Sequence, residues 1–171
     1  MERIVKPKYN HSKCGNFLFN ICVNGSIKLY NIKWLFWLLQ FTWGLPMMLF
    51  GFIVSFVLIC CGKKPIKTPI GWRFEVGSGW GGFECGIVYV RDKKRRETLD
   101  SLDCHEMGHC LAQNAILGPL CPFLVSIPSA IRYWYRELHK SDKYVPYDAV
   151  WFEDAASVGG EYFVKNLLKN N

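Results

Sequence analysis

Residues 34–61 form an unbroken run of 28 residues without a charged side chain, bounded by Lys33 before it and by Lys63 and Lys64 after it. A membrane-spanning helix needs about 20 apolar residues, so this run predicts a membrane segment. One straight helix of this length would measure about 42 Å, against about 30 Å of hydrocarbon, so the segment must tilt, kink or lie flat. Gly44 and Pro46 mark the expected break. A kinked span and a shallow hairpin both fit.

The charge on either side of this run predicts its partner. Residues 1–33 carry a net charge of +5, residues 62–97 carry +5, and residues 98–171 carry −3. Basic flanks around an apolar run attract anionic lipid headgroups, whereas nucleic-acid binding requires bases interleaved with polar and aromatic groups on a folded face. We therefore expect a lipid bilayer as partner and no nucleic acid.

The motif His105-Glu106-x-x-His109 predicts a metal site. Two imidazoles four residues apart lie on one helical face and can bind zinc, and Glu106 between them can reach a metal-bound water as general base. Thr98 or Asp100 can cap this helix, and Leu99 and Leu102 share the inward face with the motif. The alternative is an exposed helix that carries two histidines by chance.

A zinc site needs a third protein ligand and an open position for water. Glu153 is the best candidate, because residues 147–161, apart from Gly159 and Gly160, predict a second helix, and the small residues Ala156 and Ser157 follow Glu153 one turn later on the same side. Small side chains would let the two helices approach closely. The rival ligands are Asp154, Glu161, Asp148 and His139.

With these residues the chain resembles the zincin metallopeptidases whose third ligand is a glutamate on a later helix, in the pattern Glu-x-x-Ala/Ser-Asp. Ser157 stands here at the fifth position, where the family has an aspartate that supports a histidine ligand, so the resemblance implies weaker support from a hydroxyl. It also implies Zn²⁺ as cofactor, a peptide or protein as substrate, and hydrolysis by a zinc-activated water with Glu106 as general base. In the family an edge strand pairs with extended substrate, and residues 87–90 match its position.

The remaining segments complete the predicted fold. Residues 72–76 and 86–90 predict a β-hairpin, and residues 91–96 a solvated basic turn. Residues 110–131 are uncharged and contain Pro119, Pro122 and Pro128, which favours a broken or re-entrant membrane segment. Their surroundings resemble a pattern in small bacterial integral membrane proteins with His-Glu-x-x-His. The predicted fold is mainly α with a short β-hairpin: a membrane-anchored, zincin-like α+β protein with one membrane segment or hairpin and a second membrane-embedded segment.

This organisation divides the chain into a basic N-terminal segment at 1–33, which includes His11 and is expected at the surface, a membrane segment at 34–61, and a catalytic domain at 62–171 with a membrane-associated segment at 111–131. Eight cysteines without framework spacing predict reduced thiols, with Cys104 and Cys110 as small core residues. The bases after residue 61 outnumber those before residue 34, which favours an integral membrane protein whose catalytic part faces the cytoplasm.

The predicted function is a membrane-bound zinc metalloendopeptidase. Tyr147, Tyr144 and His139 are unranked candidates for stabilising the oxyanion. A different class fits the same sequence: a non-enzymatic membrane adaptor with a structural or vestigial metal site. A pore-forming protein would explain the apolar runs but not the metal motif.

Overall fold

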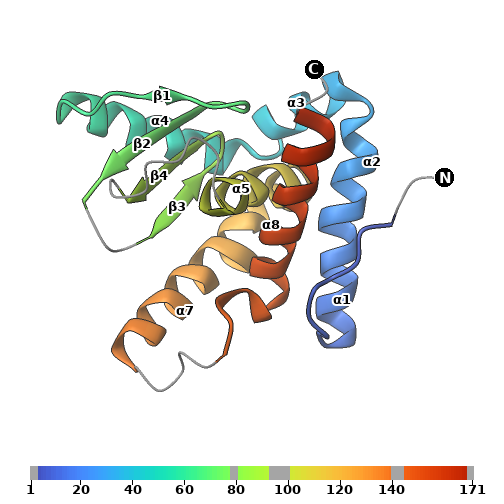
Figure 1. The fold of residues 1–171 in the computed structure, drawn as a ribbon. Coiled ribbons are helices and arrows are strands. Elements are labelled where there is room, and N and C mark those ends of the chain that lie inside the picture. Colours follow the sequence, from blue (N-terminus) through green and yellow to red (C-terminus); the bar gives the residue numbers. More distant parts are fainter. Residues whose placement is uncertain (1–3, 78–80, 93–100, 140–144, 169–171) are drawn as a thin grey trace.

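The computed structural model describes residues 4–77, 81–92, 101–139 and 145–168. Within these ranges the protein is mainly helical, with one four-stranded sheet (Figure 1). The α-helices are α1 Lys13–Asn20, α2 Ser26–Tyr30, α3 Lys33–Phe41, α4 Leu45–Cys60, α5 Ser101–Gly108, α6 Ala115–Leu117, α7 Ile127–Leu138 and α8 Trp151–Tyr162. The strands are β1 Ile66–Lys67, β2 Trp72–Val76, β3 Gly82–Cys85 and β4 Val88–Asp92.

Short π-helical and 3-10 turns connect these helices. The π-helical turns are η1 Ile21–Gly25, η2 His109–Asn114, η4 Pro122–Ser126 and η7 Phe163–Leu168, and the 3-10 turns are η3 Gly118–Leu120 and η6 Tyr147–Ala149. Because α5, η2, α6 and η3 follow one another directly, the metal motif lies on a helix that continues well beyond His109. Thr98, Leu99 and Asp100, expected near its start, lie outside the described residues.

The sheet has the strand order β1-β2-β4-β3. β4 pairs in parallel with β2, with Trp72 opposite Val88, and antiparallel with β3, with Cys85 opposite Val88. The expected hairpin between residues 72–76 and 86–90 is therefore wrong in its pairing. Every residue of β4 is buried, so the strand needs a neighbour on both edges, and residues 82–85 supply the second one. Consequently residues 87–90 do not lie at an edge, and β3 is the edge strand beside them.

Helices cover both faces of this sheet (Figure 1). A Cβ added to Gly51 of α4 would lie 2.1 Å from the carbonyl oxygen of Cys85, so α4 lies directly against β3. On the other face, Asp103 of α5 binds Arg73 of β2 at 2.9 Å and Arg91 of β4 at 3.1 Å. The sheet therefore lies between α4 and α5, and α8 and the N-terminal helices follow beyond α5.

Arg91 differs from its expected place in a solvated turn. It is fully buried at the end of β4, where its guanidinium also lies 3.0 Å from Glu75, while residues 93–96 of the same expected turn lie outside the described residues. A buried guanidinium needs carboxylate partners, and β2 and α5 provide them through Glu75 and Asp103. This ion cluster fixes α5 on the sheet two residues before His105.

The uncharged run forms two helices rather than one. The break expected near Gly44 and Pro46 is confirmed: α3 ends at Phe41, α4 begins at Leu45, and their axes differ by 69°. Pro46 lies in the first turn of α4, where a missing backbone N–H costs nothing. Gln40 of α3 donates to the carbonyl of Cys110 at 2.8 Å and accepts from Asn114, which holds the bend against η2.

No helix among the described residues is by itself both long and apolar enough to cross a membrane. Two bent pairs meet the criteria of length and composition together: α3 with α4, and residues 102–120 with residues 122–138, which meet at 110°. The expected break in residues 110–131 falls at this second bend. Pro128, by contrast, lies in the first turn of α7 and breaks nothing.

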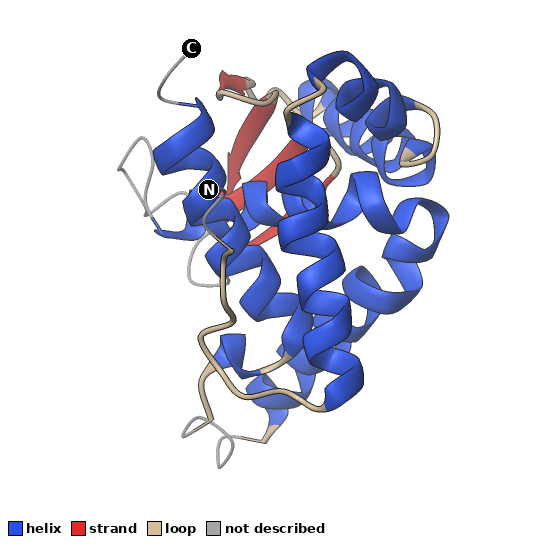
Figure 2. Ribbon diagram, turned by 90° about the vertical axis from the view of Figure 1, so that its right-hand side faces the viewer, coloured by secondary structure: helices blue, strands red, loops and turns tan. Residues whose placement is uncertain are grey.

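The N-terminal segment is not the surface segment that composition suggested. α1, η1 and α2 form one long helix, which lies on the side of the molecule that faces the viewer in Figure 2. Phe19, Cys22 and Val23 of this helix are fully buried, and His11 contacts Asp154 of α8 at 2.8 Å. Residues 4–33 therefore belong to the folded body, because their apolar side chains pack on α8 and η2 rather than remaining in solvent.

Candidate metal centre

The centre depends on a close approach between α5 and α8. A Cβ added to Gly108 would lie 1.9 Å from the carbonyl oxygen of Ala156, and one added to Gly160 would lie 1.9 Å from that of Cys104. The two backbones are therefore in contact, which only glycine permits at these positions. Ala156 lies at the contact as its small size indicated. Gly159 and Gly160 were excepted from the expected helix, but α8 continues through both to Tyr162, and the contact at Gly160 was not foreseen.

The three predicted ligands meet between these helices. The Nε2 atom of His105 lies 3.0 Å from Oε2 of Glu153, that of His109 lies 3.4 Å from the same oxygen, and the two Nε2 atoms lie 3.2 Å apart. Glu153 is fully buried, His109 is buried, and His105 is half-buried. The buried cluster of His105, His109 and Glu153 can hold a metal ion.

The spacing of these atoms suits a tetrahedral metal. Ligand atoms at about 2.0–2.1 Å from Zn²⁺ in a tetrahedron are about 3.3 Å from one another. The three separations between His105, His109 and Glu153 are 3.0, 3.2 and 3.4 Å, so they match three edges of one face of such a tetrahedron. The fourth corner of a tetrahedral ion would remain for a non-protein ligand.

Two neighbours orient the imidazoles. The amide nitrogen of Gln113 donates to the carbonyl of Phe152, so its oxygen is free to accept from Nδ1 of His109 at 2.8 Å. Nδ1 of His109 therefore carries the proton, and in the neutral ring Nε2 presents its lone pair to Glu153. Nδ1 of His105 lies 2.8 Å from Oγ of Ser157, at the position expected for second-ring-nitrogen support. Gln113 was missed, although its place four residues after His109 puts it on the same helical face.

The Glu153 carboxylate and the two imidazoles shift one another's pKa values. Burial alone would raise the pKa of Glu153, but His105 and His109 beside it hold that pKa well below its usual range. Burial lowers the pKa of His105; it also disfavours the charged form of His109, yet the nearby Glu153 carboxylate prevails and raises the pKa of His109 to about 9. Neither buried oxygen of Glu153 accepts a hydrogen bond from the described residues. A proton on His109 or a metal ion can balance the Glu153 carboxylate, and the donor set suits a metal.

Glu106 lies beside the three ligands without joining them. Its side chain is 4% exposed, and burial raises its pKa to about 8. A Cβ added to Gly82 would lie 2.9 Å from Oε1 of Glu106, so this carboxyl reaches from α5 to the edge strand β3. Glu84 is on the same side of β3 as Gly82, and burial raises its pKa to about 7. Sequence reasoning singled out neither Gly82 nor Glu84, because their proximity to Glu106 depends on strand pairing.

Of the two oxyanion candidates within the described residues, Tyr147 lies beside the ligands and His139 does not. Its ring centre lies 6.4 Å from that of His105, and burial together with the Glu153 carboxylate raises its pKa. Its hydroxyl lies 3.0 Å from Oγ of Ser129 on α7. His139 is exposed and stacks on Tyr135, and Tyr144 lies outside the described residues.

The rival ligands have other partners. Asp154 contacts His11, Asp148 contacts Lys8 at 2.9 Å, and exposed Glu161 pairs with Lys165. All eight cysteines are free thiols, with Cys110 buried and Cys104 partly exposed. The rival acids therefore bind partners outside the cluster of His105, His109 and Glu153.

Comparison with models of protein families, with curated proteins and with solved structures gives no match for this chain.

Proposed function

We propose that the protein is a membrane-bound zinc metallopeptidase of zincin type. The observation that carries this proposal is the set of three nitrogen and oxygen atoms of His105, His109 and Glu153, separated by 3.0–3.4 Å in a buried site. Histidine and carboxylate ligands of this number are typical of catalytic zinc, which keeps one open position. Zinc bound there would lower the pKa of a water molecule and polarise a peptide carbonyl.

Glu106 supplies the acid–base function in this proposal. It follows His105 directly on α5, it is buried, and its side chain makes no hydrogen bond within the described residues. A carboxyl in this state can take a proton from the attacking water and deliver it to the leaving nitrogen. The Tyr147 hydroxyl is the proposed donor to the developing oxyanion, because the Tyr147 ring lies beside that of His105. In this proposal an extended peptide substrate lies along β3, the edge strand of the described sheet, beside Glu106.

Exposed apolar side chains support the membrane part of the proposal. α4 exposes Phe50, Ile53, Phe56 and Ile59, and α7 exposes its own large apolar residues, namely Ile127, Ile131, Trp134 and Leu138. The two elements adjoin, because Ser126 before α7 contacts Met47 of α4 at 3.7 Å. Such a surface favours burial in a bilayer.

The basic residues support the orientation. Exposed Lys33 precedes the bent pair α3–α4, and exposed Lys63 and Lys64 follow it, so both ends of the pair carry positive charge. Anionic headgroups attract such flanks on one membrane side. In this proposal the helices enter and leave the bilayer from the same side, and the catalytic part faces the cytoplasm.

Metal content and hydrolysis together test the proposed function. The purified protein should hold about one zinc per chain, and Glu106→Gln should keep the zinc while peptide hydrolysis falls by about 10²- to 10⁴-fold, because only the base is lost. His109→Ala should lose both. Loss of zinc in Glu106→Gln would contradict the assigned role, and zinc binding by the wild type without hydrolysis of a peptide library would favour an adaptor with a structural metal.

A further inference from the structure

We propose that the N-terminal segment at residues 5–11, called the strap below, positions the metal ligand Glu153. This inference rests on the proposed metal site. Asp154, the residue after Glu153, is fully buried, and its carboxylate accepts from the backbone N–H of Lys8 at 3.0 Å and of Tyr9 at 3.2 Å. His11 Nε2 lies 2.8 Å from the same oxygen. Three groups of the strap therefore converge on one carboxylate next to the ligand.

Two tertiary hydrogen-bonding contacts hold the first turn of α8 on either side of Glu153: Gln113 binds the carbonyl of Phe152, and the strap binds Asp154. The N-cap residue of α8, Val150, offers no side-chain acceptor to the turn. The backbone contacts with α5 are made through Ala156 and Gly160, one turn and two turns after Glu153. Because an uncapped first turn frays readily, the contact of Asp154 with the strap restrains the residue directly after the ligand, as Gln113 restrains the residue directly before it.

The strap also contacts Asp148, which lies in the 3-10 turn η6 that leads into α8. Lys8 Nζ and the Tyr9 hydroxyl each lie 2.9 Å from a carboxylate oxygen of Asp148. Asp148 follows Tyr147 directly. Its side chain is partly exposed to solvent, so this second contact is weaker than the one at buried Asp154. The same two strap residues thus bind the neighbours of both Tyr147 and Glu153.

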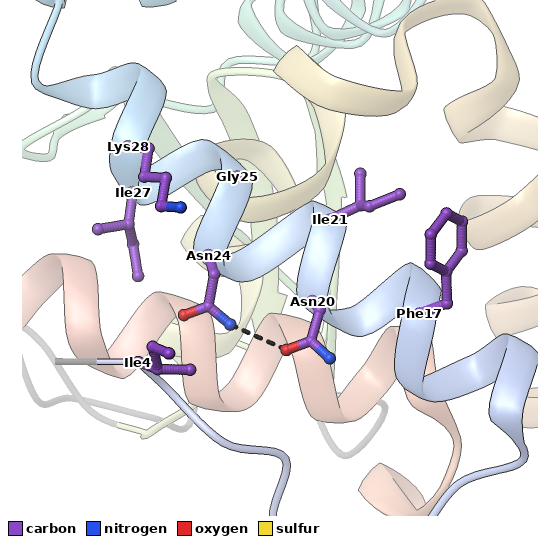
Figure 3. A pocket seen from close by; sticks show the side chains of 8 residues that line it. All are labelled: Ile4, Phe17, Asn20, Ile21, Asn24, Gly25, Ile27 and Lys28. Atoms are coloured by element: carbon purple, nitrogen blue, oxygen red, sulfur yellow. Dashed lines mark hydrogen bonds between the residues drawn. The ribbon is translucent and has the colours of Figure 1, made fainter. Parts of the chain in front are cut away.

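The other end of the strap is fixed to the N-terminal helix. The side chain of Asn24 in η1 accepts from the backbone N–H of Val5 at 2.8 Å and donates to its carbonyl at 2.9 Å. Figure 3 shows Asn24 beside Ile4 and its further bond to Asn20, at 3.1 Å. With one end held by Asn24 and the other by Asp154, the strap ties the N-terminal helix to the ligand turn.

Two variants at the strap contact test this role, with zinc affinity as the readout. Asp154→Asn keeps the size of the side chain and removes its charge, and His11→Ala removes one strap donor while leaving α8 unchanged. Competition with a chromogenic chelator should show zinc bound about 10- to 100-fold more weakly by Asp154→Asn, the range for groups that orient a ligand, and more weakly by a smaller factor for His11→Ala. The visible spectrum of bound Co²⁺ should change in the same order.

The matched control is Glu161→Gln, an acid of the same helix whose partner is exposed Lys165. It should bind zinc as the wild type does. Thermal unfolding of the metal-free proteins separates positioning from general stability. If both strap variants bind zinc as tightly as the wild type does, the inference is overturned, even if they unfold at lower temperature. If Asp154→Asn does not fold, His11→Ala decides alone. A wild type that binds no zinc refutes the proposed function and this inference, whereas one that binds zinc without hydrolysis refutes only the function.

Discussion

Two buried clusters of ionisable side chains include residues of α5 that are only two positions apart, Asp103 and His105. Their charges are balanced in different ways. In the ion cluster, Asp103 faces the guanidinium groups of Arg73 and Arg91, and Glu75 adds a second carboxylate. In the metal-ligand cluster, the single carboxylate of Glu153 faces two imidazoles, and within the described part of the chain it forms no ion pair with a guanidinium or ammonium group.

The difference teaches what each cluster requires. Fixed positive charges of arginine neutralise Asp103 at every ordinary pH, so the ion cluster is complete from protein groups alone. His105 and His109 become cationic only by binding a proton, and neutral rings present lone pairs instead. A cluster that gathers three lone-pair donors in a buried site is stabilised by a metal cation, so the first cluster is expected to carry stability and the second to carry function.

The largest effect is expected from breaking the ion cluster. Asp103→Ala should lower the free energy of unfolding by about 3–5 kcal/mol, because two buried arginines then lose a carboxylate partner in a site that excludes water. Denaturant unfolding in a mild detergent measures it. Glu75→Gln is the control, and it should cost less because Glu75 is partly exposed. A loss from Asp103→Ala no larger than that of the control would remove the distinction between the clusters.

Metal removal should affect only the second cluster. Free zinc at about 100 times its dissociation constant should stabilise the wild type by about 2.7 kcal/mol, since the ion binds the folded site. Glu153→Ala should abolish this gain, and a chelator should reverse it in the wild type. The comparison would fail if zinc stabilised the Glu153→Ala protein as much as the wild type.

Gln113 allows a finer test of how the metal-ligand cluster is oriented. Gln113→Ala should weaken zinc binding by about 10- to 100-fold, equivalent to about 1.4–2.7 kcal/mol, because His109 loses the acceptor that fixes its ring. Gln113→Glu keeps an acceptor at the same place and should bind zinc more tightly than Gln113→Ala. Chelator competition gives both affinities, and the reverse order would show that His109 is oriented by another group.

Ser157 should have the smallest effect. Its hydroxyl supports His105 with one neutral hydrogen bond, so Ser157→Ala is expected to weaken zinc binding by about threefold to tenfold. Ser157→Asp, which introduces a charged acceptor at this position, should strengthen it. Isothermal titration at equal protein concentration compares the three proteins; a larger loss from Ser157→Ala than from Gln113→Ala would invert the assigned importance of the two supports.

The residues that a local pattern identifies are those whose geometry depends on one helix. His105, Glu106 and His109 are brought to one face by helical periodicity, and Pro46 begins a helix because its ring fixes φ and removes a backbone donor. Glu153 was singled out because small residues follow it one turn later on the same side of its expected helix. The helical repeat and the covalent geometry of the chain were enough for these inferences, whereas the support of a histidine by Ser157 came from the resemblance to zincin metallopeptidases.

Tertiary structure decided what depends on contacts between distant segments. The parallel pairing of β2 with β4, the burial of Arg91 and the place of Gly82 beside Glu106 follow from strand order, which several arrangements of the same alternating pattern permit. The strap contact joins residues about 140 positions apart, and no local preference encodes it. The sequence by itself determined which side chains can bind a metal, because that depends on chemical type and local spacing. Only the packed chain decided how they are oriented, since burial and orientation depend on neighbours from other elements.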